Sequence, residues 1–416
     1  MTDKLKMNPN ISKIYIHMGM TKTATSSIEA TLYDEANKEI LNRNDLYFPI
    51  KCTHHKLITN KFSSGARRYM FNIESSPNGI PLIQYDDIFE DEILQCRNKN
   101  AMIYAEAVGD LSEEELIDFK NYVNQLMPNA EIELILCVRE FYSWTGASIQ
   151  QVMKVRGVDI KNYIGLRYRK RDNTKVFQRF INVFGKESIV AYKFEDACKH
   201  ENGPVGYFLE LVNIREGIEN VVIHKENEGF SENATLLMNY INNTVPIVWQ
   251  GAVNKLRQVD DIMPLSEISG RKYRLDKSSF KKLKKIIKKE TDYTYKEFGI
   301  DYYQEMALAK PRKKIEYAES YFSDMTKIFP ELSDILRRLV YDYHNKIKRE
   351  VSKKNGRDVL TKINAWIEEM YPEVLKIEIP KEQKVNFIMY RPMMKYSTRF
   401  LSKCSRKVKK LLRINN

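Results

Sequence analysis

The chain has 416 residues, of which 43% are hydrophobic and 30% are charged, and its formal net charge is +13. This length predicts two or three domains, or one large domain with an extension, and the apolar content is enough for a sizeable core. The composition excludes a wholly disordered protein, and 16 glycines and 13 prolines exclude a collagen-like one. The five cysteines are scattered without a CxxC pair, so we expect reduced thiols and no zinc site.

The positive charge is concentrated at the C-terminus. Residues 381–416 hold eleven Lys or Arg and one acidic residue, a net charge of +10, which leaves only +3 for the rest of the chain. No nucleic-acid-binding surface on the main body is therefore predicted. The N-terminal segment lacks an apolar signal core, and the longest apolar runs are shorter than the roughly 18 residues that span a bilayer. We expect a soluble, cytoplasmic protein.

Strand and helix patterns alternate over the first 200 residues. Alternation and β-forming residues predict strands at 12–18, 45–50, 99–106, 131–138 and 188–194. Apolar residues three or four apart predict helices at 26–42, 111–126, 141–153 and 174–185. The helix at 111–126 begins with a capping box formed by Ser112 and Glu115. This order predicts an α/β fold with a P-loop-like parallel sheet flanked by helices.

The strand patterns stop after about residue 204, and the patterns that follow are helical. Pro311 lies in a segment, 305–313, that is a plausible domain junction. We therefore divide the chain into an α/β domain at 1–305, an α-helical C-terminal extension at 306–380 and a basic amphipathic tail at 381–416.

The tail interleaves apolar residues such as Phe387, Met393, Phe400 and Leu411 with its basic residues. That composition suits a helix that lies on an anionic membrane surface, which would make the protein peripheral on the inner face of the membrane. The alternative is a helix that packs on the domain and keeps its lysines in water.

The most informative segment is the strand, turn and helix start at 13–30, KIYIHMGMTKTATSSIEA. Small hydroxyl residues and a lysine at the start of a helix are typical of a phosphate or sulfate site, because helix N-termini present free N–H groups and a partial positive charge. Thr21, not glycine, precedes Lys22, so the segment departs from the nucleotide-binding pattern GxxxxGK[ST]. The alternative is a Thr- and Ser-rich cap before an ordinary surface helix.

Arg139 directly follows the predicted strand at 131–138. Ligands bind at the carboxyl edge of a parallel sheet, so a charged residue there predicts a functional role. The alternative is a surface arginine that pairs with Glu140 or Glu106.

Together the turn and the arginine resemble the sulfotransferases that use 3′-phosphoadenosine 5′-phosphosulfate (PAPS), most closely the bacterial sulfotransferase-like proteins that act on glycans. The resemblance covers about residues 11–305. In that family a turn of the form KTGTTS holds the 5′-phosphosulfate, and the positions that match it are Lys22, Thr23, Ala24, Thr25, Ser26 and Ser27. Ala24 stands where the family usually has glycine, whose missing Cβ permits a left-handed backbone.

The resemblance also implies a site for the 3′-phosphate. Arg139 matches the family's arginine, and the family's serine usually lies eight residues later, where this chain has Ala147. Ser148 could substitute for it, and Ser143 is a weaker choice. Phe194 takes the aromatic position of a YED-like sequence at the end of the later strand.

Sulfuryl transfer resembles phosphoryl transfer in that positioning and charge stabilisation carry most of the catalysis. The resemblance places Lys22 near the bridging oxygen, and no metal is required. A base must take the proton of the acceptor hydroxyl or amine. The adjacent His54 and His55 and the carboxylate of Glu106 are rival candidates, since related sulfotransferases use either type. Alternatively the histidines begin a surface helix and Glu106 forms an ion pair with Arg139 or Lys22.

A basic run at 167–175 offers Arg167, Arg169, Lys170 and Arg171 to an anionic acceptor, although such a run is usually a solvated face. The leading hypothesis is a PAPS-dependent sulfotransferase with a carbohydrate or glycolipid acceptor. The alternatives are a nucleotide-dependent kinase with a divergent phosphate loop, and a membrane-associated scaffold that kept the fold and lost the chemistry.

Overall fold

The structure is a computed structural model that describes residues 12–18, 20–48, 58, 61–63, 90–91, 94, 99–104, 106–170, 172–226, 229–249, 252–258 and 261–379. These residues form two compact units. The first, the sheet unit, contains the described residues up to Ile149 together with Leu166–Gly229 and Tyr273–Lys313. The second, the helical unit, contains Gln150–Gly165, Phe230–Lys272 and the described residues from Lys314 onward.

The sheet unit is built on five parallel strands in the order β2-β3-β1-β4-β5. Their bounds are β1 Lys13–His17, β2 Leu46–Tyr47, β3 Asn100–Tyr104, β4 Glu131–Val138 and β5 Ile189–Lys193. β1 lies at the centre, with Ile16 paired to Ile103 of β3 on one side and to Leu134 of β4 on the other. The predicted α/β class with a parallel sheet flanked by helices is therefore confirmed.

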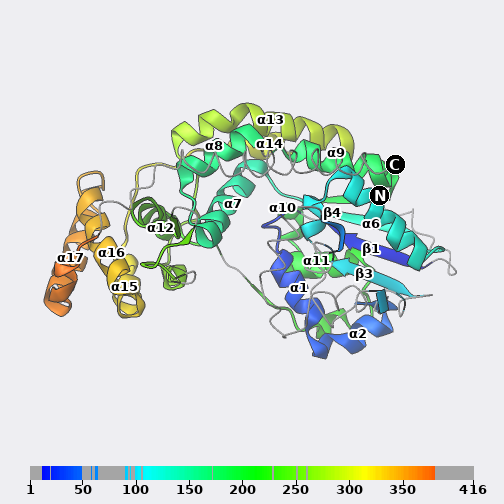
Figure 1. Ribbon diagram of the computed structural model, residues 1–416, viewed down its shortest axis with the longest axis horizontal. Helices are drawn as coiled ribbons and strands as arrows, with labels where there is room; N and C mark the ends of the chain where they lie inside the picture. The colour runs from blue at the N-terminus through cyan, green and yellow to red at the C-terminus, as the bar shows by residue number, and fades with distance from the viewer. Residues whose placement is uncertain are drawn as a thin grey trace, which may run out of the picture. The chain divides into compact units, whose positions relative to one another are not determined.

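Helices cover both faces of this sheet (Figure 1). Side chains alternate between the faces of a strand, so Tyr15, Met102, Ile135 and Tyr192 share one face. They form a buried core with residues of α1 (Thr25–Tyr33), α2 (Lys38–Arg43) and α11 (Gly203–Leu211). Helices α6 (Glu113–Leu126) and α9 (Asn173–Phe184) contact each other over the opposite face.

Two helix starts show how local sequence sets the elements. The capping box of α6 is present as predicted, with the Glu115 N–H 3.2 Å from Ser112 Oγ and the Ser112 N–H 2.8 Å from Glu115 Oε2. The single helix predicted at 26–42 is wrong, because Asp34 is extended and separates α1 from α2. The Asp34 carboxylate accepts the Ala36 N–H at 2.9 Å and contacts His224 Nε2 at 2.6 Å, so its side chain stabilises the break.

Further helices of the chain are α7 Phe141–Arg156, α8 Ile160–Lys170, α10 Phe194–Ala197, α13 Lys277–Phe298 and α14 Tyr303–Leu308. The basic run at 167–175 includes the end of α8, which reaches Lys170, and the start of α9 at Asn173. Asp172 then begins α9 by accepting the Thr174 N–H at 3.1 Å.

The helical unit contains α12 (Glu232–Thr244), α15 (Glu319–Ile328), α16 (Asp334–Ile347) and α17 (Arg357–Met370). These helices pack against one another: α12 contacts α16, and α15 contacts α17. Because α12 is nearly a hundred residues from α16 in the chain, the helical unit is assembled from separate stretches of sequence. A short antiparallel pair, β6 (Val248–Trp249) and β7 (Ala252–Val253), corrects the expectation that strands stop after 204.

Among the described residues, no helix is long and apolar enough to cross a membrane. The basic tail at 381–416 lies outside the described residues.

Candidate functional site

The site is built around the turn at residues 20–24, between the end of β1 and the start of α1. Strand order reverses at this point, because β2 and β3 lie on one side of β1 and β4 and β5 lie on the other. The Met18 N–H donates to Ile135 O at 3.0 Å and the Met20 N–H to Cys137 O at 3.3 Å, so the chain follows β4 beyond the strand's end. In open α/β sheets, ligands bind outside the carboxyl ends of the strands at such a reversal.

The backbone of the turn is left-handed at two residues that are not glycine. Lys22 has φ 66° and Ala24 has φ 63°. A side chain with a Cβ costs about 1–2 kcal/mol in this conformation. Ala24 directly precedes the first residue of α1, and a left-handed residue next to a right-handed one turns successive N–H groups toward one concavity that suits an anion.

Three consecutive carbonyl groups of the turn accept side-chain hydrogen bonds. Thr23 Oγ1 donates to Met20 O at 2.6 Å, Trp144 Nε1 to Thr21 O at 2.9 Å, and Arg139 Nη1 to Lys22 O at 2.7 Å. In a planar trans peptide the N–H points away from the C=O that precedes it. Each N–H group of residues 21–23 therefore points away from the donor that binds the carbonyl before it, so these donors do not block it.

Arg139 follows β4 and binds the turn with one arm of its guanidinium. Its Nε and Nη2 lie 3.0 and 2.8 Å from Ser143 Oγ, and its Cζ lies 5.0 Å from the centre of the Phe194 ring. Burial lowers the pKa of Arg139, although an arginine remains charged in a protein. The arrangement places a fixed positive charge and an exposed hydroxyl beside the turn.

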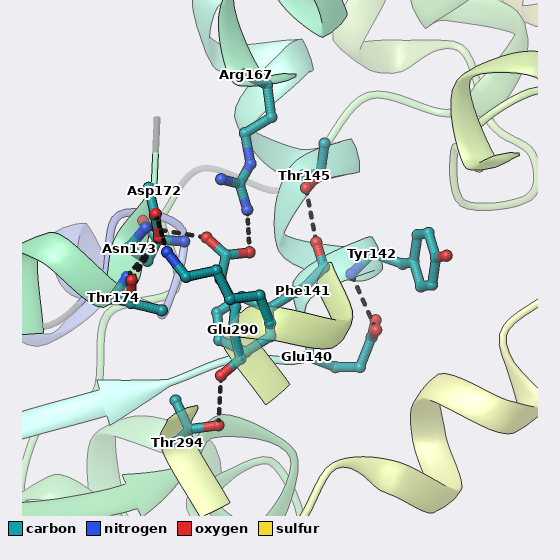
Figure 2. Close-up of polar contacts among 11 residues, drawn as sticks. Glu140, Phe141, Tyr142, Thr145, Arg167, Asp172, Asn173, Thr174, Glu290 and Thr294 are labelled. Atoms are coloured by element: carbon teal, nitrogen blue, oxygen red, sulfur yellow. Dashed lines mark hydrogen bonds and ion pairs between the residues drawn. The ribbon is translucent and has the colours of Figure 1, made fainter. Parts of the chain in front are cut away.

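Hydrogen bonds to Glu140 and Glu195 fix the start of α7, and with it the positions of Arg139 and Ser143. The Glu140 carboxylate accepts the N–H groups of Tyr142 at 2.9 Å and Ser143 at 2.7 Å, and the Tyr142 contact is drawn in Figure 2. Burial raises the pKa of Glu140. Glu195 in turn accepts the Glu140 N–H at 3.2 Å, and the Tyr302 hydroxyl lies 2.6 Å from Glu195 Oε2.

The hydroxyl residues predicted to hold a phosphate have different surroundings. Thr23, Thr25 and Ser27 are buried, whereas Ser26 is partly exposed. Ser27 Oγ accepts the Glu226 N–H at 2.9 Å, so this hydroxyl fastens α1 to the segment at 221–226. Lys22 is partly exposed.

The serine beside Arg139 is Ser143, the candidate that the spacing favoured less. Ser148 is 2% exposed, and its Oγ has no hydrogen-bond partner in the part of the chain that the structure describes. A helix places residues four apart on one face, so Ser143 lies over Arg139 while Ser148 does not.

The assignment of Arg167 to an exposed acceptor site is corrected by its burial. Its side chain is 0% exposed, forms an ion pair with Glu290 and lies over the Trp144 ring. The described backbone places Arg169 and Lys170 at the end of α8, and Arg171 lies outside the described residues.

The candidate bases remain predictions. His54 and His55 lie outside the described residues. Glu106 lies two residues after Tyr104, the last residue of β3, and begins a 3₁₀ turn, Glu106–Asp110. Among the described side chains, no group of three or more His, Cys, Asp or Glu is arranged to hold a metal ion.

Sequence reasoning did not select Trp144, the residue that donates to Thr21 O. A tryptophan in an amphipathic helix is ordinarily a core residue, and Trp144 is indeed 3% exposed. The only available signal was its place five residues after Arg139, near the start of the same helix.

No protein-family model matches the chain, and neither does any curated protein sequence. Among solved structures, the chain is similar to the crystal structure of a sulfotransferase from Alicyclobacillus acidocaldarius. The match has 10% sequence identity and a TM-score of 0.37, and it covers 70% of this chain and 96% of that one. A match at this level does not assign a function.

Proposed function

We propose that this chain is a sulfotransferase that moves a sulfuryl group from PAPS to a hydroxyl or amine of a carbohydrate or glycolipid acceptor. The observation that carries the proposal is the turn at 20–24, in which the carbonyl groups of Met20, Thr21 and Lys22 accept side-chain hydrogen bonds and the backbone is left-handed at Lys22 and Ala24. Such a turn binds an anion through its amides.

The residues present fit a donor that carries two separate anionic groups. The turn, Lys22 and the first amides of α1 would hold the 5′-phosphosulfate. Arg139 and Ser143 would hold the 3′-phosphate, because a guanidinium and a hydroxyl suit phosphate oxygens. Phe194 lies against the Arg139 guanidinium and would offer its ring to the adenosine.

The chemistry then rests on charge and position. When bound, PAPS supplies the activated sulfuryl group. Lys22 stabilises the negative charge that grows on the phosphate side, and the fixed amides of the turn need no reorganisation as it grows. Glu106, at the end of β3, and the pair of His54 and His55 are the alternatives for the base that takes the acceptor proton.

A kinase of the P-loop class is the second enzyme to consider. Its loop needs a glycine before the lysine so that the backbone can approach the phosphates closely, and this chain has Thr21 there. A scaffold without catalysis is the alternative of another class. Lys22 and Ala24 adopt strained backbone conformations in the turn. Because strain of this kind is concentrated at functional sites, we favour an enzyme over a scaffold.

Calorimetric titration with 3′-phosphoadenosine 5′-phosphate tests the donor site, with ATP and magnesium as the comparison. We expect binding in the micromolar range, and a loss of at least about a hundredfold in Lys22→Ala and in Arg139→Ala, since each removes a charged contact to phosphate. Lys327→Ala is the matched control, because Lys327 is an exposed lysine of α15 in the helical unit.

Each other result has a definite meaning. Failure of the folded wild-type protein to bind the bisphosphate would contradict the proposal and favour the scaffold. Tight binding of ATP with magnesium instead would favour the kinase. Equal weakening by Lys327→Ala would show that the loss is not specific to the turn. PAPS consumption in the presence of candidate acceptors then distinguishes transfer from simple binding.

We also propose that residues 381–416 bring the enzyme to an anionic membrane, beside a lipid-linked acceptor. The support is the charge of this segment, +10 in 36 residues, interleaved with apolar side chains. Sedimentation with anionic liposomes should pull down the full chain and not a variant truncated after residue 380. Equal sedimentation of the two would contradict this part of the proposal.

A further inference from the structure

Trp144 connects the turn to the interior of the sheet unit. It lies on the first turns of α7, it is 3% exposed, and its Nε1 donates to Thr21 O at 2.9 Å. The next carbonyl along the turn, that of Lys22, accepts from Arg139. Two residues near the start of α7 therefore hold two consecutive carbonyl groups of the turn.

A buried cation lies over the ring of the Trp144 indole. The Cζ of Arg167, on α8, lies 4.8 Å from the centre of the Trp144 ring. A guanidinium over an indole face is attracted by the ring quadrupole, and the attraction is stronger when both groups are removed from water. Arg167 is 0% exposed, so water does not compete with this contact.

Glu290 of α13 fixes the position of that cation. One carboxylate oxygen forms an ion pair with Arg167, and the other accepts the Asn173 N–H, at the start of α9, at 2.9 Å (Figure 2). The Glu290 side chain is also 0% exposed. Four helices, α7, α8, α9 and α13, thus contribute to one chain of contacts that ends at the Thr21 carbonyl.

A buried ion pair is not the simplest way to stabilise a core. Replacing such a pair with apolar residues of similar volume is often neutral or stabilising, because removing two charges from water is costly. A cation prefers the face of the ring to its edge, so the ion pair favours one orientation of the indole, which aliphatic side chains of the same volume would not do. The pair is therefore better explained by its effect on Trp144 than by stability.

We propose that Trp144 is a positioning residue for the anion-binding turn and that the buried Arg167–Glu290 pair holds Trp144 in the orientation this requires. The expected effect of Trp144 on binding of the donor rests on the proposed function. In this proposal Arg167 orients the Trp144 indole and does not bind the acceptor.

The test compares Trp144→Phe with Trp366→Phe. Trp144→Phe keeps an aromatic ring under Arg167 and removes the N–H, whereas Trp366 lies in the helical unit against Phe329 and Tyr371. We expect Trp144→Phe to weaken binding of 3′-phosphoadenosine 5′-phosphate about tenfold, the value of one hydrogen bond. Trp366→Phe should bind like the wild type, although it loses the same volume. Equal binding by the two variants would overturn the proposal.

Two further measurements keep the inference testable. If Trp144→Phe does not fold, a tryptophan analogue with sulfur in place of the indole N–H, incorporated at position 144, makes the same comparison at unchanged shape. If the wild-type protein binds no bisphosphate, the proposed function fails, and hydrogen exchange of the ligand-free protein decides the positioning role. The amides of Met20 and Ile28 should then exchange faster in Trp144→Phe than in Trp366→Phe. Equal exchange would overturn the inference.

The double variant Arg167→Met with Glu290→Leu tests the ion pair without leaving a lone buried charge. A positioning role predicts a folded protein whose affinity for the bisphosphate falls severalfold, because the indole loses its orienting cation. Wild-type affinity in the folded double variant would overturn the role of the pair.

Discussion

The sheet unit and the helical unit differ in how much backbone strain they contain. Among the described residues, the non-glycine residues with positive φ are Lys22, Ala24, Asp45 and Asn213, and all four lie in the sheet unit. Two of them lie in the turn after β1. In the described part of the helical unit, the residues with positive φ are glycines, Gly157 and Gly270. Strain collects where a backbone must present its amides to something outside itself, so the contrast separates the unit that carries the site from the unit that does not.

Removing one partner of a buried ion pair should give the largest effect. Glu290→Gln removes the carboxylate charge from the ion pair with Arg167, and Asp261→Asn does the same for Arg257, whose side chain is also 0% exposed, in the helical unit. We expect each variant to lose about 3–5 kcal/mol of unfolding free energy, measured by urea unfolding. Only Glu290→Gln should also weaken binding of the bisphosphate. Weakened binding in folded Asp261→Asn would remove this distinction between the units.

Acid should destabilise both units through a buried neutral histidine. Burial lowers the pKa of His17 and of His344 to about 3. The unfolded chain takes up a proton near pH 6.5 while the folded protein does not, so stability is complete above that pH and falls as the pH drops toward 3. Each histidine should cost about 1.4 kcal/mol per pH unit in this window, or about 2 kcal/mol at pH 5.

The two histidines differ in their hydrogen-bond partners, so their replacement should have different effects on stability at neutral pH. Neither nitrogen of His17 has a hydrogen-bond partner among the described residues, and its ring stacks on Tyr104 at 4.4 Å. His344 Nε2 lies 2.9 Å from the Tyr321 hydroxyl. His17→Phe should reduce the acid sensitivity at little cost at neutral pH. His344→Phe should cost about 1–3 kcal/mol at neutral pH, because it leaves a buried hydroxyl unpaired. Equal cost at pH 7.5 would contradict this difference.

Within the sheet unit, two serines near Arg139 should differ in their effect on the donor. Ser143→Ala removes the hydroxyl that lies 2.8 and 3.0 Å from the guanidinium, and we expect bisphosphate affinity to fall by about three- to tenfold. Ser148→Ala removes a buried hydroxyl that has no hydrogen-bond partner among the described residues, and it should leave affinity unchanged or raise stability slightly. Calorimetric titration of both variants decides which serine serves the site.

The smallest predicted effect has opposite signs in the two units. Ala24→Gly removes the Cβ from a left-handed residue and should stabilise the sheet unit by about 1 kcal/mol. Ala365 is exposed in the middle of α17, so Ala365→Gly should destabilise the helical unit by about the same amount. Thermal unfolding measures both. A loss of stability in Ala24→Gly would show that the turn is not strained at this residue.

Sequence reasoning located the elements well where a local signal exists. The capping box of α6, the strands around β1 and the long helix α13 are patterns of hydrogen bonding and periodicity that neighbouring residues determine. The break between α1 and α2 was missed because Asp34 acts partly through His224, a residue far away in the chain. Local periodicity contains no information about such a partner.

The candidate site shows the same division. Lys22 and Arg139 follow the ends of strands, and the order of the strands alone brings them together, which the 2.7 Å contact between Arg139 and the Lys22 carbonyl reflects. Arg167 was assigned to an acceptor site because it belongs to the basic run at 167–175. Its partner, Glu290, is 123 residues away, so no window of sequence could indicate the burial.

The sequence by itself therefore determined the α/β class, the turn between β1 and α1 and the place of Arg139 after β4, because these depend on period, propensity and position along a strand. Only the tertiary structure decided that Ser143 serves Arg139, that Trp144 holds the Thr21 carbonyl and that Arg167 lies behind the site. Those roles depend on side chains that meet across distant segments. Whether a polar group faces water or a partner is a property of the packed fold, since desolvation makes the unpaired alternative too costly.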